Sequence, residues 1–313
     1  MDTYRFERLS ESNMIFLIRL YEECFNLKVN LDFLKKKYNT SLFGAEFIGF
    51  FAIDIKTSQP AGYYGVFPIY CKIKGQKVLA AQSGDTMTSP NHQGKGLFTT
   101  LAKMTYELAQ KEGIDFVFGF PNKNSYPGFI KKLAWKHYGD VNNYVIKTGA
   151  LPFDKVAKKN SLFRSIYNKY VDFKLNRIKS KNIFSNSIEF QNPESGFVIH
   201  DQAFFNYKTY FNFYTIKINH VNCVIKIDGS MWVGDIDFCS KEEFNNTIKG
   251  LISLAKGMGC ANIQFSVFHD TFYDIILKEK YEIKNKMPVG FISFNENVSP
   301  EKFAYQAIDF DTY

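Results

Sequence analysis

The chain has 313 residues, which favours two domains over one because a typical domain holds about 100–200 residues. Hydrophobic residues make up 45% of the sequence and aromatic residues 17%, so a large core can form and global disorder is excluded. The first residues, MDTYRFERLS, lack a signal-peptide pattern, and no apolar stretch reaches the roughly 18 residues of a membrane span. We therefore expect neither a secreted nor an integral membrane protein, and neither a collagen-like nor a coiled-coil one.

The cysteines are few and widely separated. The chain has five of them, and none forms a CxxC pair: Cys24, Cys71, Cys223, Cys239 and Cys260. This spacing argues against a zinc site and against a disulfide framework, and it is typical of a reducing compartment. We expect a cytoplasmic protein that uses no metal.

The net charge of +8 is unevenly distributed along the chain. Residues 1–150 carry 19 basic and 13 acidic side chains, a net of +6, and residues 151–182 carry nine and two, a net of +7. Residues 183–313 have a net charge of −5. The basic front half favours an anionic small ligand, a nucleic acid or a membrane surface as partner, whereas the rear half argues against nucleic acid. Ordinary variation of surface charge is the alternative.

The front half shows helical and strand patterns that together predict a mixed α/β sheet with helices on its faces. Apolar residues at helical spacing predict helices over 12–25, 97–112 and 126–137. Runs rich in Phe, Tyr and Val predict strands over 47–54, 61–70, 77–87, 114–120 and 142–147. A hairpin turn is expected at Lys74-Gly75-Gln76. In the helix over 97–112, the stripe expected to face the core is Leu97, Leu101, Met104 and Leu108.

Residues 155–181 form a basic amphipathic segment. Its large apolar residues are predicted to share one side of a helix, with Lys and Arg between them: Leu162, Phe163, Ile166, Tyr167, Tyr170 and Phe173. We favour a connecting helix packed on the body, because covered apolar stripes are much commoner than interfacial ones. A helix that lies on a membrane surface is the alternative.

The rear half repeats the layout of the front half. Strands are predicted over 221–228, 231–238, 261–268, 288–294 and 303–309, and helices over 240–256 and 270–280. Ser240 and Glu243 have the spacing of a capping box, and Asp228-Gly229 is a predicted hairpin turn. The recurring order of strand, helix and strand predicts a tandem duplication. We expect domains over 1–150 and 183–313, joined by the basic segment 151–182.

One segment of the front half carries recognisable chemistry. The strand that ends at Thr88-Ser89-Pro90 is followed by the loop Gln93-Gly94-Lys95-Gly96, which turns directly into the predicted helix over 97–112. Unpaired N–H groups and the positive end of the helix dipole then meet at one point and form an anion site. The two glycines let the backbone approach a pyrophosphate closely, and the lysine adds a positive charge. The loop lacks the Gly-Lys-Ser/Thr motif of a P-loop and the spacing of a dinucleotide fingerprint.

The segment Gln93-Gly94-Lys95-Gly96-Leu97-Phe98 resembles the Q/R-x-x-G-x-G/A acyl-CoA loop of the GNAT (Gcn5-related) N-acyltransferase superfamily. The preceding strand AAQSGDTMTSP, the following strand IDFVFGFPN and the helix NSYPGFIKKLAWKHYG are similar to that family's core. The resemblance covers residues 1–148. The rear half resembles a second GNAT-like fold with Cys239-Ser240-Lys241 in place of the loop. The resemblance therefore implies two tandem GNAT-like domains of mixed α/β fold, with one acyl-CoA site, in the front domain.

The resemblance also implies which residues form the acyl-CoA site. Gln93, Gly94, Lys95, Gly96, Leu97 and Phe98 would bind the pyrophosphate through backbone N–H groups. Met87 and Thr88 would pair with the pantetheine arm and help to polarise the thioester carbonyl, and Asn122 and Ser125 would lie near the thiol end. Phe98 departs from the family's Gly or Ala; a side chain of this size could still point into the core if only its N–H group is used. Ile130 stands where many members have a tyrosine acid, which leaves the proton donor unassigned.

Acyl transfer to an amine needs a neutral amine, a polarised carbonyl and a proton for the departing thiolate. Asp85, three residues before Thr88, is a candidate base or amine anchor. An aspartate hydrogen-bonded to a neighbouring loop is the equal alternative. Tyr126 is the candidate proton donor to the thiolate, and a packed aromatic ring beside Pro127 is the alternative.

These features predict an N-acyltransferase that moves an acyl group from acyl-CoA to a primary amine by direct attack in a ternary complex. Tandem GNAT-like chains of this size resemble bacterial N-acyltransferases of amino sugars. The implied acceptor is a nucleotide-linked amino sugar of surface-polysaccharide (O-antigen, lipopolysaccharide) biosynthesis, of the dTDP-3-amino-3,6-dideoxyhexose type, with the rear domain as a wall of its pocket. An aminoglycoside-type acetyltransferase and a non-catalytic module that responds to CoA or associates with membranes or RNA are the alternatives. We expect small-molecule partners, without nucleic acid and without stable membrane insertion.

Overall fold

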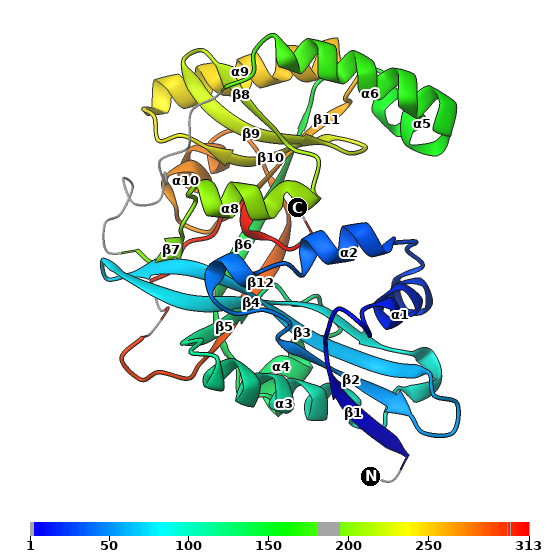
Figure 1. Ribbon diagram of the computed structural model, residues 1–313. Helices are drawn as coiled ribbons and strands as arrows, with labels where there is room; N and C mark the ends of the chain where they lie inside the picture. The colour runs from blue at the N-terminus through cyan, green and yellow to red at the C-terminus, as the bar shows by residue number, and fades with distance from the viewer. Residues whose placement is uncertain (1–2, 181–194, 299, 301, 313) are drawn as a thin grey trace. The chain divides into compact units, whose positions relative to one another are not determined.

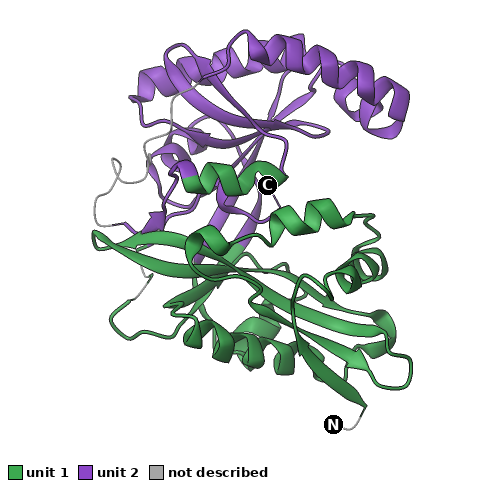
Figure 2. Cartoon of the chain, viewed as in Figure 1, with its two compact units in different colours: residues 1–138, 203–210, 288–302 green, residues 139–202, 211–287, 303–313 purple. Residues whose placement is uncertain are grey.

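The computed structural model describes residues 3–180, 195–298, 300 and 302–312 and confirms the predicted mixed α/β fold (Figure 1). The chain forms two compact units, which Figure 2 distinguishes by colour. Unit 1 comprises Met1–Tyr138, Ala203–Tyr210 and Pro288–Lys302; unit 2 comprises Gly139–Gln202, Phe211–Met287 and Phe303–Tyr313. Among the described residues, no helix combines the length and the apolar composition of a membrane span.

The sheet of unit 1 is mostly antiparallel. Its strands follow the order β1 (Tyr4–Arg8), β2 (Gly49–Asp54), β3 (Pro60–Ile73), β4 (Gln76–Thr88) and β5 (Phe116–Gly119). β5 is parallel to β4, and the end of β12 (Ile283–Ser293) pairs antiparallel with β5. The predicted hairpin between β3 and β4 is confirmed, because Lys74 and Gly75 both have the positive φ that a type I′ turn requires.

Helices cover both faces of this sheet. They are α1 (Ile15–Phe25), α2 (Leu31–Lys37), α3 (Leu97–Lys111), α4 (Tyr126–Lys132) and most of α8 (Gln202–Tyr207), with short 3-10 turns at Ser41–Phe43, Pro90–His92 and Lys208–Tyr210. α1 and α2 share a core with Phe51 and Tyr63, whereas α3 and α4 share a core with Ala52 and Tyr64. Successive strand residues point to opposite faces, so neighbours in the sequence enter different cores.

The buried face of α3 differs from the predicted stripe. Leu97 and Leu101 are buried as expected, but Met104 and Leu108 are only half-buried. The rest of the buried face consists of Ala102, Thr105, Tyr106 and Ala109. Small side chains allow the helix to lie close to the sheet, where the Thr105 hydroxyl donates a hydrogen bond of 3.2 Å to the backbone carbonyl of Tyr64.

The prediction of a helix over 126–137 is wrong at its C-terminal end. α4 ends early, and Ala134 takes a positive φ of 56°. This turn directs Trp135 into the core of unit 1, where its ring centroid lies 4.4 Å from that of Phe129. β6 (Lys136–Lys147) therefore begins earlier than the predicted strand.

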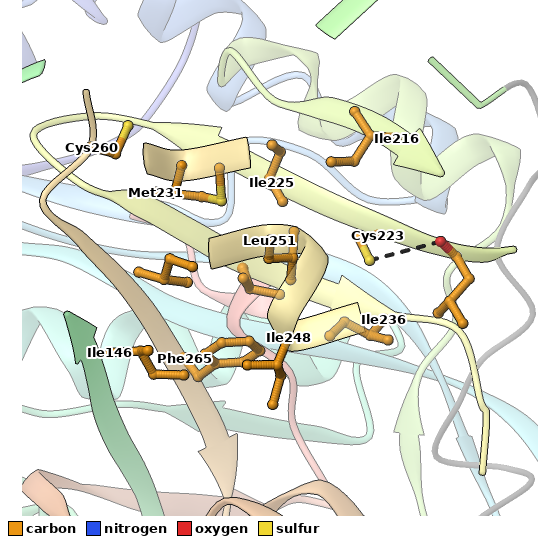
Figure 3. Packing of buried hydrophobic residues seen from close by; sticks show 14 of the residues in the cluster. Ile146, Ile216, Cys223, Ile225, Met231, Ile236, Ile248, Leu251, Cys260 and Phe265 are labelled. Atoms are coloured by element: carbon orange, nitrogen blue, oxygen red, sulfur yellow. Dashed lines mark hydrogen bonds between the residues drawn. The ribbon is translucent and has the colours of Figure 1, made fainter. Parts of the chain in front are cut away.

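The sheet of unit 2 has a similar order. Its strands are β6, β11 (Asn262–Phe268), β10 (Met231–Ile236), β9 (Val221–Ile227) and β8 (Tyr214–Ile218), and the unit also contains β7 (Phe197–Val198). Its helices are α5 (Phe153–Lys159), α6 (Ser161–Asn176), α9 (Lys241–Gly257) and α10 (Phe272–Lys278). β10 and β11 are parallel, and the other pairs are antiparallel. Figure 3 shows part of the core, where Ile225 and Met231 of the strands meet Leu251 of α9.

The predicted strand over 303–309 is wrong. This segment makes isolated bridges at Phe303 and Gln306 and then forms a 3-10 turn over Ala307–Asp309. The physical reason is a capping box: the Asp309 carboxylate accepts a hydrogen bond of 2.8 Å from the backbone N–H of Gln306.

The two units are interleaved along the sequence. Both contain antiparallel strands, a helix and a parallel strand in the same order, with α3 between β4 and β5 and α9 between β10 and β11. However, β6, which follows α4, lies mostly in unit 2, and the end of β12, which follows α10, lies in unit 1. The chain therefore passes from unit 1 to unit 2 after Tyr138 rather than near residue 150. Most of β6 then belongs to unit 2, and the end of β12 belongs to unit 1.

A charged cluster is buried in unit 2. The His200 ring places Nδ1 2.9 Å from an Asp235 carboxylate oxygen and Nε2 2.6 Å from an Asp309 oxygen, and all three side chains are about 1% exposed. Burial lowers the pKa of His200, but the charge of Asp309 and the hydrogen bonds and charge of Asp235 outweigh it and raise the pKa to about 9. His200 is therefore a buried cation at neutral pH.

We expect the stability of unit 2 to fall as the pH rises through about 9. The folded pKa of His200 lies above the unfolded value near 6.5, so its contribution is complete below pH 6.5 and is lost as pH passes the folded value. The loss should approach about 3 kcal/mol, measured as the free energy of unfolding at several pH values. The His200→Gln variant should be less stable at neutral pH and should lack this slope. A wild-type slope that persists in the variant would contradict the assignment.

Candidate functional site

The loop before α3 leaves a group of backbone donors open. Gly94 and Gly96 have φ of 76° and 78°, and a Cβ atom built on either meets no atom within 4 Å. Gly96 is the N-cap of α3 and has no side chain to cap the helix. In the described part of the chain, the N–H groups of residues 94–99 have no hydrogen-bond partner. An exposed helix start with free N–H groups and the dipole behind it binds anions.

The corresponding helix start in unit 2, that of α9, is capped by its own side chains. At the start of α9, the Ser240 hydroxyl accepts the Glu243 N–H at 3.2 Å, and the Glu243 carboxylate accepts the Ser240 N–H at 2.8 Å. This confirms the predicted capping box. In α9, the N–H groups of Ser240 and Glu243 are therefore already bonded to side chains of the protein, whereas the N–H groups at the start of α3 are open.

The Phe98 side chain packs against the core of unit 1, which is the orientation that leaves only its N–H group at the loop. Its ring centroid lies 5.1 Å from that of Phe129 in α4 and 6.1 Å from that of Tyr64. A Cβ at Gly128 would lie 3.0 Å from the Phe98 ring. Phe98 thus offers only its N–H at the loop, and it holds the starts of α3 and α4 next to each other.

β4 and β5 separate near the middle of β4. Their pairing ends at Gln82 and Phe118, although β4 continues to Thr88. A β-bulge follows at once, with Asp85 and Thr86 opposite a single residue of β3, and Asp85 has a φ of 52°. The second half of β4, including Met87 and Thr88, is thus directed away from β5. An unpaired strand edge offers backbone groups to an extended ligand.

The Asp85 side chain lies in a buried ion pair rather than at the open strand edge. Its Oδ1 is 2.7 Å from the Lys37 ammonium nitrogen, and its Oδ2 accepts a 2.7 Å hydrogen bond from the Tyr38 hydroxyl. The side chains of Lys37 and Asp85 are 3% and 5% exposed. Burial, followed by the charge of Asp85, raises the pKa of Tyr38 well above its ordinary value. These contacts correspond to the alternative interpretation of Asp85, in which the carboxylate is hydrogen-bonded to neighbouring residues of the fold.

A chain of hydroxyl groups begins where β4 and β5 separate. The Ser83 hydroxyl lies 2.8 Å from that of Tyr64, which lies 2.9 Å from that of Tyr106. The indole N–H of Trp135 donates to Tyr106 at 2.9 Å. A Cβ at Gly119, at the end of β5, would lie 3.2 Å from the Ser83 Cβ. Ser83 therefore stands at the opening with buried hydrogen-bonding groups behind it.

The remaining predicted residues lie at the start of α4. The Asn122 side-chain oxygen accepts hydrogen bonds from the N–H groups of Asn124 at 2.9 Å and Ser125 at 3.0 Å, so it stabilises the turn into the helix. Tyr126 is half-buried, and its ring stands edge-on to His137 with centroids 5.8 Å apart. The Asn122 oxygen thus has a structural task.

Two further groups near the bulge were not expected from the sequence. Lys37 and Tyr38 belong to α2 and its C-cap, an element that the sequence patterns did not reveal. The only signal is the spacing of Leu34, Lys37 and Tyr38, which places a lysine on the apolar side of a short helix. Cys24 of α1 lies beside the backbone of Thr88, and burial, followed by the charge of Glu23, raises its thiol pKa to about 11. None of the five cysteines, which all lie in the described ranges, forms a disulfide bond.

The described residues contain no group of three or more His, Cys, Asp or Glu side chains arranged to hold a metal ion. What the site offers is a set of backbone donors at a helix start, an open strand edge and hydroxyl groups nearby. These groups suit a long ligand with an anionic end.

Comparisons with known proteins agree with this geometry. Residues 5–138 match the family model of the acetyltransferase (GNAT) domain. A search of curated proteins finds no significant match. Solved structures of similar fold include a GCN5-related N-acetyltransferase from Kribbella flavida, with a TM-score of 0.62, 8% identity, and coverage of 93% of this chain and 71% of that chain.

Two other structures show the same fold. The GCN5-related N-acetyltransferase from Anabaena variabilis has a TM-score of 0.58 and 13% identity, over 93% of this chain and 73% of that one. The N-myristoyltransferase of Saccharomyces cerevisiae with bound myristoyl-CoA has a TM-score of 0.55 and 9% identity, over 93% of this chain and 82% of that one. The chain therefore shares the fold of these acyltransferases. The match of residues 5–138 to the GNAT acetyltransferase domain supports an acyl-CoA-dependent N-acyltransferase.

We expect the Asp85→Asn variant to be less stable than the wild type by about 3 kcal/mol, because it leaves the Lys37 ammonium buried without a counter-charge. The double variant Asp85→Asn/Lys37→Met should recover much of this loss, because neither partner then carries a charge. The free energy of unfolding in denaturant measures both effects. Asp32→Asn, an exposed change in α2, is the control and should alter stability by less than about 0.5 kcal/mol. If the losses of stability caused by Asp85→Asn and by Lys37→Met alone simply add up in the double variant, the two side chains are not coupled.

Proposed function

We propose that this protein transfers an acyl group from acyl-CoA to the primary amine of a nucleotide-linked amino sugar, of the dTDP-3-amino-3,6-dideoxyhexose type, in surface-polysaccharide biosynthesis. The observation that carries the transferase part is the open N-terminus of α3, with free N–H groups over residues 94–99. The net charge of +6 over residues 1–150 favours two anionic substrates, acyl-CoA and a nucleotide sugar. Both substrates belong to the cytoplasm, where we place the reaction.

In this proposal the pyrophosphate of acyl-CoA binds the loop Gln93–Phe98. The backbone N–H groups donate to its oxygens, the α3 dipole favours its charge, and Lys95, which is exposed, adds a mobile cation. The glycines let the phosphates approach the backbone because no Cβ atom stands in front of them. The pantetheine arm then runs along the free edge of β4 and pairs with the main chain of Met87 and Thr88.

The amine of the acceptor attacks the thioester carbonyl carbon, and the carbonyl oxygen takes up the negative charge. A backbone N–H of β4 stabilises that charge, because a fixed donor in a site without water acts strongly on a developing anion. The carbon–sulfur bond then breaks, and the thiolate leaves with the bonding electrons. The nitrogen releases its extra proton to solvent and the thiolate takes up one proton, so the reaction gains and loses no net proton. Holding the two substrates in place supplies much of the rate, up to about 7–11 kcal/mol.

We assign Tyr126 the protonation of the thiolate, because it is the first residue of α4, and the first turn of α4 lies against Phe98 at the start of α3. Asp85 acts through structure: its ion pair with Lys37 fixes the bulge that turns β4 away from β5. A direct role as base would require the carboxylate to leave both Lys37 and Tyr38. Asn122 and Ser125 hold the turn that positions Tyr126.

The Gly94→Ala variant should bind CoA at least about tenfold more weakly than the wild type, as measured by titration calorimetry. Its Cβ would occupy the space in front of the loop and would strain a positive φ by about 1 kcal/mol. Gly113→Ala is the matched control, because Gly113 has a φ of 79°, equally open surroundings and a place at the other end of α3. Equal affinity for CoA in the two variants would remove the loop from the binding site.

The reaction itself is tested with a panel of acyl-CoA thioesters and nucleotide-linked amino sugars, by following thiol release and the mass of the acylated product. We expect release that depends on the amine. The Tyr126→Phe variant should lower kcat by about 100-fold with the affinity for CoA unchanged, because it removes only a proton donor. If kcat is unchanged, the proton has another source, and Ser83→Ala would then test the hydroxyl chain. Binding of CoA without acylation of any amine would overturn the transferase proposal.

A further inference from the structure

α6 has two apolar faces, and only one of them is covered. Tyr167, Val171 and Leu175 are buried in the core of unit 2. The predicted single stripe is wrong in this respect, because of its residues only Tyr167 is buried and Phe163 is half-buried. A connecting helix that packs on the body needs one covered face, and Tyr167, Val171 and Leu175 form that face. This packing does not explain the second apolar face.

The second face of α6 is a continuous apolar stripe in solvent. Leu162 is 73% exposed, Ile166 60%, Phe173 57% and Tyr170 40%. At 3.6 residues per turn these positions fall within about 80° of the helix circumference. Tyr170 is held in place, because its hydroxyl donates a 2.7 Å hydrogen bond to the carbonyl of Gly257 in α9. The stripe is therefore presented by a helix that is fixed on its opposite side.

The apolar surface extends beyond α6. Leu151 is 69% exposed, and Val156 and Phe153 of α5 are 52% and 50% exposed. α5 and α6 follow each other directly and lie together at one side of unit 2, as Figure 1 shows. We call the exposed apolar residues at positions 151, 153, 156, 162, 166, 170 and 173 together the α5–α6 face. Soluble proteins rarely expose large apolar residues in such a group, and a group of this kind marks an interaction surface.

Cations border the α5–α6 face. Lys169 and Lys174 lie on either side of the stripe, and the Arg177 guanidinium stands 4.5 Å from the centre of the Phe173 ring. Residues 153–179 hold eight basic and two acidic side chains, and one of the acids, Asp154, is only 3% exposed. Of the basic groups, Lys158 is paired with Asp228 at 2.7 Å. The border of the face is therefore strongly positive.

We propose that the α5–α6 face binds the surface of a bilayer that contains anionic phospholipid. The apolar stripe enters the boundary between headgroups and acyl chains, and the bordering Lys and Arg side chains contact the lipid phosphates. A second copy of this chain fits less well, because two positive faces would repel each other. RNA would satisfy the cations but would leave Leu162 and Ile166 in water.

The test uses the full-length protein and two kinds of vesicle, phosphatidylcholine alone and phosphatidylcholine mixed with phosphatidylglycerol. We expect sedimentation with the mixed vesicles and little with the neutral ones. The triple variant Leu162→Ser/Ile166→Ser/Phe173→Ser should bind the mixed vesicles at least about 30-fold more weakly. The variant Lys169→Gln/Lys174→Gln should lose about fivefold per cation, and it should show a weaker dependence on salt.

Ile275→Ser is the matched control, because Ile275 is an apolar residue of α10 with 53% exposure in the same unit. It should bind the vesicles like the wild type, and all variants should keep the wild-type circular dichroism spectrum and affinity for CoA. Failure of the wild type to bind mixed vesicles would overturn the proposal. So would equal binding by the triple variant and the control, or binding to RNA that exceeds binding to vesicles. None of these readouts depends on acyl transfer.

Discussion

The unpaired backbone N–H groups at the start of α3 are the constraint on which the site depends. A helix leaves its first N–H groups without internal partners, and proteins usually satisfy them with a side chain. α9 does so with Ser240 and Glu243, whereas α3 begins at Gly96 and leaves its donors to solvent. This difference in capping chemistry distinguishes the open start of α3 from the capped start of α9 in two units of similar strand order. The glycines accept a positive φ, which most residues avoid, to keep the donors open.

Buried polar groups hold the rest of the site in shape. The pair of Lys37 and Asp85 lies at the bulge of β4, and the chain from Ser83 to Trp135 lies at the point where β4 and β5 part. A buried ion pair contributes little net stability, but removing one partner leaves a costly charge, so the geometry around it is specific. Both groups lie in unit 1, beside the strand edge that would receive the pantetheine arm.

The two units share more than a similar strand order, because unit 2 contains most of the strand that follows α4 of unit 1, and unit 1 contains the end of the strand that follows α10 of unit 2. β6 leaves unit 1 for unit 2, and β12 returns. Such an exchange is invisible to an analysis of hydrophobic periodicity, which reports the strand but not its partner. The same holds for α6, whose two apolar faces read as one amphipathic stripe in the sequence. Only the packing of Tyr167, Val171 and Leu175 shows which face is covered.

The sequence by itself determined the mixed α/β class, the β3–β4 hairpin, the glycine loop and the capping box of α9. These follow from local rules: turn residues with positive φ, caps, and periodicity within one element. The tertiary structure decided the end of α4, the 3-10 turn that replaces a strand over 303–309, and the exchange of β6 and β12. It also decided the burial of Asp85 with Lys37, since the chemistry of a carboxylate depends on the charges that distant residues bring to it.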